Sequence, residues 1–372
     1  MQPAKLRIVI FGLSITSSWG NGHATTYRGL VRGLVQLGHD VLFLERDQPW
    51  YAANRDLPKP PYGRTILYSS LDELQLRFRK QVREADVVIV GSYVPEGVAV
   101  GEWVLSTAEG LTAFYDIDTP VTLAKLERGD KEYLSRSLVM RYDLYLSFTG
   151  GPTLQKLERH YRSPRARVLY CSVDTNEYYP ERGVEPRWDV GYLGTYSADR
   201  QPALEKLMLQ PAANLPDWRF VVAGPMFPQN IEWPGNVQRI EHLAPVEHRH
   251  FYNSQRFTVN VTRKDMVRAG YSPSVRLFEA AACGTPIISD AWAGLQDCFE
   301  PGREILVARS TAESLRILQD TSEDERLQIG ARLRERALRE HTSEHRAFQL
   351  QEILYEALED SKAPVKHAIR SR

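Results

Sequence analysis

Short apolar runs alternate with segments of helical period along the chain. The run LRIVIFGL near the start is typical of a buried strand, residues 23–37 have the spacing of an amphipathic helix that Gly38 ends, and DVLFLE is a second strand. A strand, a helix and a strand in this order form a βαβ unit with parallel strands. The chain therefore begins as an α/β fold.

Further apolar runs of strand length follow, and they restart after an interruption. Residues 178–188, YYPERGVEPRW, are rich in proline and charge and lack periodicity, which is typical of a linker. The runs before the linker are DVVIVG, LTAFYD, LYLSF and RVLY, and those after it are DVGYLG, RFVVAG, VQRI, FTVNV, PIISD and EILVA. The pattern predicts two doubly wound, Rossmann-like domains in tandem.

The same patterns predict where the domains and the linker begin and end. We expect a first domain over residues 1–172, a linker over 173–187, a second domain over 188–342 and a C-terminal helix over 343–360. The segment from Asp324 to Glu359 is charged and helical in period, with leucines and an isoleucine on one side. Residues 361–372 are basic and lack a cap, so we expect a disordered tail.

Composition narrows the class of protein. A length of 372 residues is long for one core, and 47 basic residues balance 47 acidic ones, so no global field attracts nucleic acid or an anionic membrane. No apolar run approaches the length of a membrane span, and the run Leu6 to Ile15 lacks the features of a signal peptide. Three scattered cysteines form neither a disulfide framework nor a metal motif. We expect a cytoplasmic protein.

The segment SPSVRLFEAAACGTPIISD, residues 272–290, combines a helix and a strand. Ser272 and Pro273 predict the N-cap and first residue of a helix that Gly284 ends. Glu279 falls beside the apolar stripe, where a carboxylate needs a partner. On spacing alone, an ordinary surface pair with Arg276 is the simpler interpretation, and a ligand hydroxyl is the other.

The same segment, FEAAACGTPII at residues 278–288, together with VDTNEYYP at 173–180 and QLGHDVLFLE at 36–45, resembles the GT-B glycosyltransferases. The resemblance spans nearly the whole chain and is to the group 1, family 4-like enzymes, with the spore-maturation-type branch as the nearest version. Tyr271 stands where the family often has a further glutamate, and Ser272-Pro273-Ser274 replaces glycine-phenylalanine-glycine.

The resemblance implies a division of labour between the domains. The second domain holds a nucleotide-diphosphate sugar, the acceptor enters from the first, the C-terminal helix returns to the first, and no metal or cofactor is needed. It implies that Glu279 binds the ribose, while Ser272 and Ser274 face the diphosphate at a helix N-terminus. This favours the ligand over the surface pair as the partner of Glu279, and assigns Arg276 to the donor site.

Two further segments of the second domain complete the predicted donor site. Gly194 and Thr195 follow a strand and precede Arg200, whose planar fork suits a diphosphate; a solvated arginine at a helix start is the alternative. His242 and Leu243 follow another strand, where the family presents backbone groups to the nucleotide base; the alternative is an exposed loop.

Candidate catalytic groups lie in the first domain. The loop with Gly20, Asn21 and Gly22 is expected to face the cleft, and His23 after it is a candidate general base or simply a loop histidine.

Asp116 and Asp118 end a strand, where they can bind acceptor hydroxyls or stabilise an oxocarbenium-like sugar; the alternative is that Asp118 stabilises the next helix N-terminus. We discount a metal on this Asp-x-Asp pair, since a third oxygen ligand is missing nearby.

The predicted function is therefore a metal-independent, hexosyl-type glycosyltransferase. It moves a sugar from a nucleotide-diphosphate donor to a hydroxyl of a glycan, a small molecule or a protein, with no nucleic-acid partner and no transmembrane segment. The family resemblance implies retention of configuration, whereas a His23 base implies inversion.

Other functions remain open on the sequence. A nucleotide-sugar epimerase or hydrolase and a non-catalytic binding protein both fit the same fold. A nicotinamide oxidoreductase fits less well, on the glycines 20 and 22 and on Glu45 at the end of the second strand.

Overall fold

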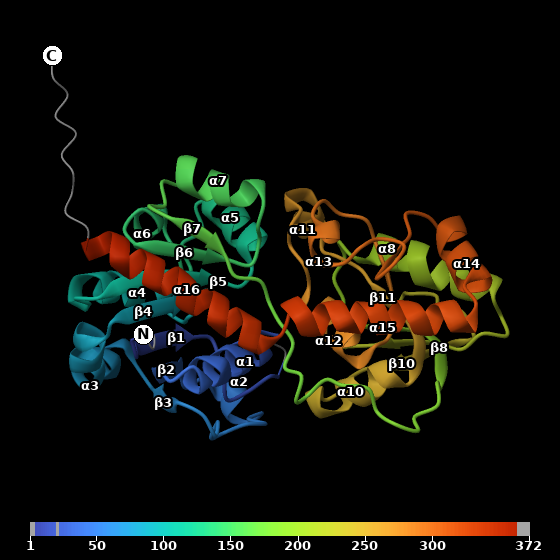
Figure 1. Cartoon of the computed structure of the whole chain (residues 1–372), viewed down its shortest axis with the longest axis horizontal. Helices are drawn as coiled ribbons and strands as arrows, with labels where there is room; N and C mark the ends of the chain where they lie inside the picture. The colour runs from blue at the N-terminus through green and yellow to red at the C-terminus, as the bar shows by residue number, and fades with distance from the viewer. Residues whose placement is uncertain (1–3, 20–21, 363–372) are drawn as a thin grey trace, which may run out of the picture.

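Two α/β domains lie side by side in the computed structural model, which describes residues 4–19 and 22–362 (Figure 1). Each domain contains one parallel sheet, with helices packed around it. The predicted fold class is confirmed, because both sheets are doubly wound and the strands of each sheet run in the order 3-2-1-4-5-6 from one edge, the first sheet adding one more strand.

The first domain has a seven-stranded sheet in the order β3-β2-β1-β4-β5-β6-β7. Its strands are β1 (Arg7–Gly12), β2 (Asp40–Arg46), β3 (Arg64–Tyr68), β4 (Val87–Gly91), β5 (Leu111–Asp116), β6 (Leu144–Ser147) and β7 (Ala166–Val168). Its helices are α1 (His23–Gln36), α2 (Pro49–Ala52), α3 (Leu71–Glu84), α4 (Gly97–Thr107), α5 (Thr119–Glu127), α6 (Arg136–Val139) and α7 (Pro152–Arg159).

The second domain has a six-stranded sheet in the order β10-β9-β8-β11-β12-β13. Its strands are β8 (Trp188–Leu193), β9 (Phe220–Ala223), β10 (Val237–Ile240), β11 (Gln255–Asn260), β12 (Ile287–Ser289) and β13 (Leu306–Val307). The helical elements are α8 (Gln201–Leu204), the π-helical turn η1 (Glu205–Leu209), α9 (Gln210–Asn214), α10 (Pro245–Asn253), α11 (Lys264–Ala269), α12 (Val275–Cys283), α13 (Leu295–Cys298), α14 (Thr311–Asp320), α15 (Glu323–Glu340) and α16 (Ser343–Lys362).

Strand β3 was not predicted from the apolar pattern. Its burial is partial along most of its length, with Arg64 exposed and three intermediate residues before the buried Tyr68. It lies at the edge of the sheet, paired with β2 alone, so it faces the core less than the central strands do. An edge strand with little buried surface leaves a weak period in the sequence.

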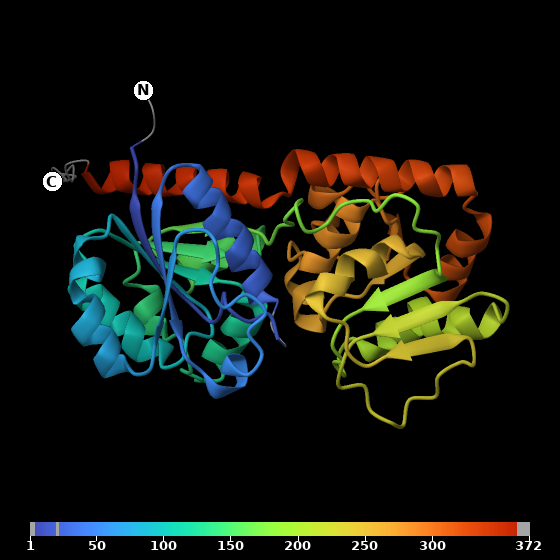
Figure 2. The same cartoon turned by 90° about the horizontal axis from the view of Figure 1, so that it is seen from below.

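Helices α15 and α16 run one after the other along one side of both domains (Figures 1 and 2). They are separated at residues 341 and 342, where Val173 at the start of the linker donates to the carbonyl of His341, 3.0 Å away. Helix α16 packs on α1 of the first domain, and Gln351 lies 3.0 Å from His39 there. The predicted return of the C-terminal helix is therefore confirmed.

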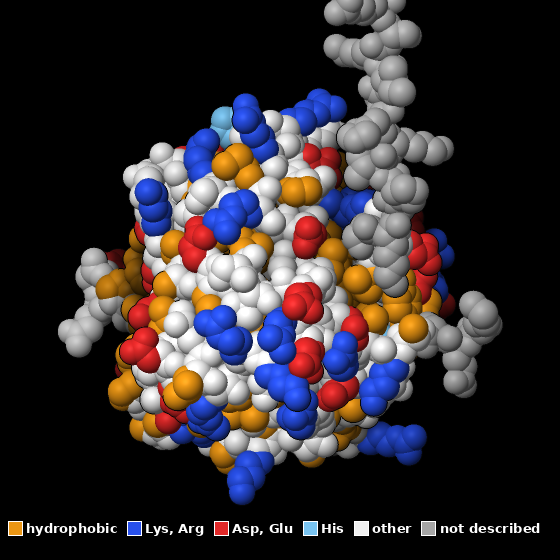
Figure 3. Space-filling view, turned by 90° about the vertical axis from the view of Figure 1, so that its left-hand side faces the viewer, with side chains coloured by type: hydrophobic (Ala, Val, Ile, Leu, Met, Phe, Trp, Pro, Cys, Tyr) orange, Lys and Arg blue, Asp and Glu red, His pale blue; other side chains and the backbone are white. Residues whose placement is uncertain are grey.

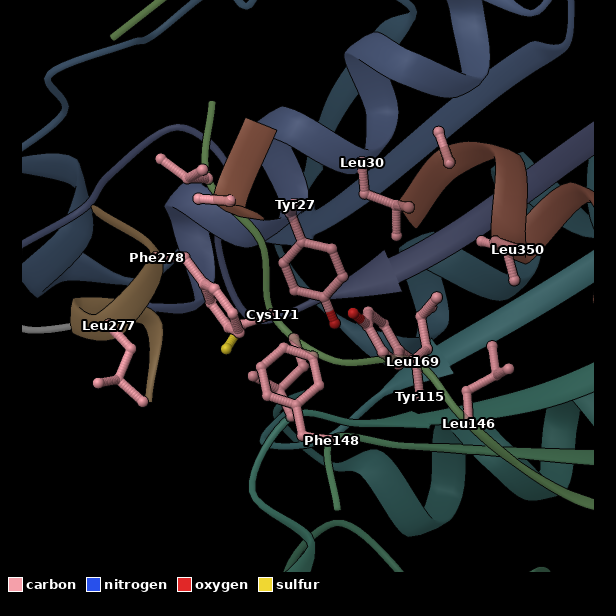
Figure 4. Close-up of a cluster of buried hydrophobic side chains, with 14 of the residues drawn as sticks. Tyr27, Leu30, Tyr115, Leu146, Phe148, Leu169, Cys171, Leu277, Phe278 and Leu350 are labelled. Atoms are coloured by element: carbon pink, nitrogen blue, oxygen red, sulfur yellow. The ribbon is translucent and has the colours of Figure 1, made fainter. Parts of the chain in front are cut away.

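One apolar core cluster contains side chains from both domains (Figure 4). Tyr27 and Tyr115 from the first domain, Leu350 from α16, and Leu277 and Phe278 from α12 belong to this cluster. Because side chains of α12 are part of a core shared with the first domain, both domains contact this helix and fix its position.

Charge is distributed evenly on the end of the first domain that faces away from the second. Lysine and arginine side chains lie among aspartate and glutamate side chains there (Figure 3). Among the helices of residues 4–19 and 22–362, none is long and apolar enough to cross a membrane. The expected tail over 361–372 lies almost wholly outside the described residues.

Candidate functional site

A cavity of about 660 Å³ lies where loops of the two domains face each other. Its walls come from the loops that follow β1, β8 and β9 and from α12, so the carboxyl ends of strands at the switch points of both sheets open into it. The lining residues are Ser18, Trp19, Gly22, Thr25 and residues 53–56 of the first domain, and Leu193, Gly194, Thr195, Arg200, Gly224, Pro225, His242, Leu243, Ala244, Pro245, His248, Tyr252, Val275, Arg276 and Glu279 of the second.

A smaller cavity of about 260 Å³ adjoins it and shares Gly22, Arg200, Val275 and Arg276 with it. The two cavities are therefore parts of one cleft. The other residues that line the smaller part are His23, Thr26, Ile117, Asp118, Phe148, Cys171, Val261, Thr262, Arg263, Met266, Pro273 and Ser274.

Glu279 is a buried carboxylate at the wall of the larger cavity. It is 6% exposed, and the hydroxyl of Tyr252 donates to its Oε2 over 3.1 Å. Burial, together with Glu279, holds the pKa of Tyr252 well above its ordinary value, so this hydroxyl keeps its proton and stays a donor. The side chain of Tyr178 is also hydrogen-bonded to this carboxylate, and Glu279 lines the larger cavity, where its oxygens can accept further hydrogen bonds.

The alternative pairing of Glu279 with Arg276 does not form. Arg276 instead donates to the carbonyl of Leu193 and, over 3.1 Å, to Oδ1 of Asn260. Its guanidinium also lies over the ring of Tyr192, 5.1 Å from the centroid. The arginine is therefore turned from α12 toward the ends of β8 and β11, and it borders both cavities.

Arg200 lines the same two cavities as Arg276. Its Nη2 donates to the carbonyl of Thr195 over 3.0 Å, and its buried Nε has no hydrogen-bond partner among the described residues. Burial lowers the pKa of Arg200, and the positive charges of Arg276 and Arg263 add to this effect. Three cations that repel one another in a cleft form a site for an anion.

Gly194 directly follows β8 and leaves room for the ends of two side chains. A Cβ atom at this position would lie 2.7 Å from Nη2 of Arg276 and 2.7 Å from the hydroxyl of Tyr192. A Cβ atom on Gly224, which directly follows the neighbouring β9, would lie 2.1 Å from the carbonyl oxygen of Gly194. The glycine thus lets the arginine of α12 reach the cleft.

The predicted helix start at Ser272 is wrong. Helix α12 begins at Val275, and Ser274 is its extended N-cap without a side-chain capping bond. The residue before a proline is disfavoured in the helical region, and Ser272 accordingly lies outside the helix. Its buried hydroxyl accepts a hydrogen bond from Thr149 of the first domain over 2.9 Å, and Ser272 is not among the described residues that line the cleft. Ser274 does line it.

His242 and Leu243 form part of the rim of the larger cavity, between β10 and α10. The carbonyl of Leu243 lies 3.3 Å from Nε2 of His248, a residue that also lines this cavity. The contact gives the loop a fixed support from α10.

His23 begins α1 and borders the smaller cavity. Its ring packs edge-on against Tyr93, with 5.3 Å between centroids, and its buried Nδ1 has no partner in the described part of the chain. Burial lowers the pKa of His23 to about 4, so the imidazole is neutral at pH 7. Gly22 lines both cavities, whereas Gly20 and Asn21 lie outside the described residues.

Asp118 and Asp116 are separated by the structure. Asp118 borders the smaller cavity, accepts from the hydroxyl of Tyr93 over 3.0 Å and lies 3.8 Å from Arg263 of the second domain. Burial raises the pKa of Asp118, which Arg263 partly offsets. Asp116 is fully buried, is not among the described cleft residues, and accepts from Thr122 over 2.7 Å. Its contacts hold the turn after β5.

Several cleft residues were missed in the sequence. Arg263 and Thr262 directly follow β11, which pairs with β8 at the switch point of the second sheet. The position after a predicted strand was the available signal for these two residues. Tyr252 and His248 lie on α10, where aromatic and histidine side chains are indistinguishable by spacing from ordinary packing residues.

Glu45 has a structural role, which removes the main support for a dinucleotide site in the first domain. Its carboxylate is fully buried and accepts from the amides of Ile15 and Thr16, at 2.7 and 3.0 Å, and from the hydroxyl of Ser14. These bonds fold the loop after β1, so the acid is not free to bind a ribose.

Metal ligands do not gather in the cleft. Across residues 4–19 and 22–362, no group of three or more histidine, cysteine, aspartate or glutamate side chains is arranged to hold a metal ion.

Comparisons with known proteins agree with this architecture. Residues 200–352 match the family described as Glycosyl transferase-like. A comparison with curated proteins finds no match.

Three solved structures show the same two-domain fold. Sucrose-phosphate synthase from Thermosynechococcus elongatus is 17% identical, with 97% of this chain and 100% of that chain covered and a TM-score of 0.67. HepE from Anabaena, in complex with UDP and glucose, is 13% identical, with 94% and 100% covered and a TM-score of 0.70. AviGT4, a glycosyltransferase involved in avilamycin A biosynthesis, is 15% identical, with 96% and 99% covered and a TM-score of 0.61. The family match covers residues 200–352, and the whole chain shares the two-domain GT-B fold of these solved structures.

Proposed function

We propose that this protein transfers a hexosyl group from a nucleoside-diphosphate sugar to an acceptor hydroxyl, in the cleft between its domains and without a metal ion. The observation that carries the proposal is the composition of the cleft. It combines a buried carboxylate, Glu279, and arginines of the second domain with His23 and Asp118 of the first. One wall thus offers groups for a nucleotide diphosphate, and the other offers groups for proton transfer or charge stabilisation.

The nucleotide is proposed to occupy the larger cavity. The carboxylate of Glu279 can accept from ribose hydroxyls, and the loop of His242 and Leu243 can contact the base with backbone groups. Arg200 and Arg276 can bind the diphosphate at the boundary of the two cavities. Two of the similar structures contain UDP or UDP-glucose, HepE and an α-glucosyltransferase, so UDP-glucose is the first donor to test.

The chemical step makes one bond and breaks one bond. The acceptor oxygen bonds to the anomeric carbon of the sugar, and the bond from this carbon to the diphosphate oxygen breaks. The electron pair leaves with the diphosphate, whose charge Arg200, Arg276 and Arg263 stabilise. In an inverting reaction, neutral His23 accepts the proton of the acceptor; in a retaining one, a phosphate oxygen accepts it and Asp118 stabilises the positive sugar.

The acceptor is proposed to approach along the first-domain wall of the larger cavity. Trp19 is 49% exposed on this wall and offers an apolar face, next to Arg55 and Asp56. A glycan, a small molecule or a protein remain the proposed acceptor classes. We further propose a cytoplasmic location and a place in the spore-maturation-type branch, on the sequence features given above.

The experiment is incubation of the purified protein with UDP-, GDP- and dTDP-sugars, with and without sugar acceptors, followed by measurement of released nucleoside diphosphate. Acceptor-dependent release that survives EDTA supports the proposal. Release without any acceptor indicates a hydrolase, an altered sugar without release indicates an epimerase, and binding without either indicates a binding protein. The anomeric configuration of the product, read by NMR, decides between His23 as base and a retaining step.

A further inference from the structure

The segment just before α12 is attached to the first domain by consecutive contacts. Residues 271–273 precede the helix that carries Arg276 and Glu279, and each of the three accepts one hydrogen bond from the first domain. The bonds are from the amide of Gly150 to the carbonyl of Tyr271 (2.9 Å), from the hydroxyl of Thr149 to the hydroxyl of Ser272 (2.9 Å) and from the thiol of Cys171 to the carbonyl of Pro273 (3.4 Å).

The ring of Tyr271 lies between two glycines, one from each domain. A Cβ atom on Gly151, in the first domain, would lie 2.4 Å from this ring, and one on Gly294, in the second, would also lie 2.4 Å from it. Both glycines have positive φ, 55° and 92°, and each is the N-cap of a helix. The two backbones therefore approach the ring more closely than any other residue type would allow.

Tyr271 itself has a strained backbone. Its φ is +48°, a region that a residue with a bulky side chain adopts at a cost of about 1–3 kcal/mol. The strain persists because its amide donates to the carbonyl of Ala293 while its carbonyl accepts from Gly150. A strained residue that is hydrogen-bonded to both domains just before α12 indicates a constraint on the relative position of the two domains.

We propose that Tyr271 is a positioning residue that clamps the two domains in the arrangement needed for transfer. The clamp consists of Tyr271, Gly151 and Gly294. It fixes Ser274 and Arg276, which follow directly in the chain, opposite His23 and Asp118 of the first domain. The inference deepens the proposed function, because the clamp brings the donor groups to the acceptor side.

The first test measures domain arrangement in the full chain without any substrate. Small-angle X-ray scattering should give Tyr271→Ala a larger radius of gyration than the unmodified protein. Without the ring, the contact that joins Gly151 of the first domain to Gly294 of the second is lost, and the two domains can move apart. Tyr271→Phe keeps the ring and should match the unmodified protein. Equal radii for Tyr271→Ala and the unmodified protein would overturn the clamp.

A second pair of variants approaches the clamp from the first domain. Gly151→Ala places a methyl group against the ring and should enlarge the protein like Tyr271→Ala. Gly129→Ala is the matched control, because Gly129 also has positive φ, 79°, but no atom within 4 Å of an added Cβ. If Gly129→Ala changes the scattering as much as Gly151→Ala does, backbone strain rather than the clamp is responsible, and the proposal fails.

Turnover of UDP-glucose links the clamp to the reaction. We expect Tyr271→Ala to lower kcat by about tenfold or more, since small displacements of reacting groups are costly, and to change the Kd for UDP by less than about threefold. Tyr271→Phe should restore most of the lost kcat. A drop in UDP affinity with unchanged kcat would contradict a positioning role. If the unmodified protein neither binds nor turns over UDP-glucose, the proposed donor fails, whereas the scattering comparison still decides the clamp.

Discussion

At the scale of single residues, Glu279 shows how burial prepares a polar group for a ligand. The side chains of Tyr252 and Tyr178 are hydrogen-bonded to its carboxylate, which also lines the larger cavity. A buried carboxylate is costly unless it is hydrogen-bonded, and the two tyrosines keep this acid in place at the cavity wall. The proposed ribose contact uses the acceptor capacity that the carboxylate presents to the cavity.

We predict that Glu279→Gln weakens UDP binding about tenfold or more. A hydrogen bond to a charged group contributes about 1.5–3 kcal/mol, and about 1.4 kcal/mol is a factor of ten in affinity. Isothermal titration calorimetry measures the effect. Glu335→Gln is the control, because Glu335 is an acid on α15 with a side chain 75% exposed, and its replacement should leave the affinity unchanged. An unaltered affinity in Glu279→Gln would remove the ribose assignment.

Asp116 offers a prediction about pH at the same scale. Burial raises its pKa to about 6, whereas an unfolded aspartate titrates at about 3.9. The folded chain therefore holds this proton more tightly, and the stabilisation is complete below about pH 4 and is lost as the pH rises through about 6. Asp116→Asn has no proton to lose in this range. Its melting temperature should therefore depend less on pH between 4 and 7 than that of the unmodified protein. An unchanged dependence would show that Asp116 is not the responsible group.

At the scale of elements, helices meet where glycines permit it. Helix α16 crosses α1 at Gly29, where an added Cβ would lie 2.1 Å from Oγ of Ser343. Helix α12 starts only at Val275, and Ser272 and Pro273 before it are hydrogen-bonded to the first domain. Local capping signals alone placed this start two residues too early.

The crossing of α1 and α16 can be tested by substitution. Alanine is favoured over glycine in a helix by about 1 kcal/mol, but overpacking costs about 1–3 kcal/mol, so we expect Gly29→Ala to lower the melting temperature. Ser343→Gly in the same chain should recover most of the loss, since it removes the atoms that the new methyl group meets. Additive effects of the two changes, measured by thermal unfolding, would contradict this contact.

At the scale of the whole molecule, binding of a nucleotide should raise the free energy of unfolding. A ligand that binds the folded protein alone adds about 2.7 kcal/mol at a concentration one hundred times its Kd. We predict that UDP raises the melting temperature and that EDTA leaves this shift unchanged, because the proposed donor site binds the diphosphate with arginines and not with a metal. A UDP-induced shift that EDTA abolishes, measured in a thermal-shift assay, would show that a metal is required.

The sequence alone determined the type and order of most elements. Central strands such as β1, β4 and β8 are buried on both faces and leave continuous apolar runs, and the restart of the pattern after residue 188 predicts a second sheet. The cleft residues that follow strands, Gly194 and Asp118, were predictable for the same reason, since ligands bind at strand ends of doubly wound sheets. Edge strand β3 left too little buried surface to be read.

The tertiary structure decided which polar groups share the cleft. Asp116 and Asp118 are equivalent in sequence pattern, yet one supports a turn and the other faces the cavity. The partner of Glu279, the role of Glu45 and the position of Tyr271 between two glycines all depend on contacts between segments far apart in the chain. Periodicity reports which side of an element is buried, whereas the identity of the neighbour across an interface is set by the packing of the whole chain.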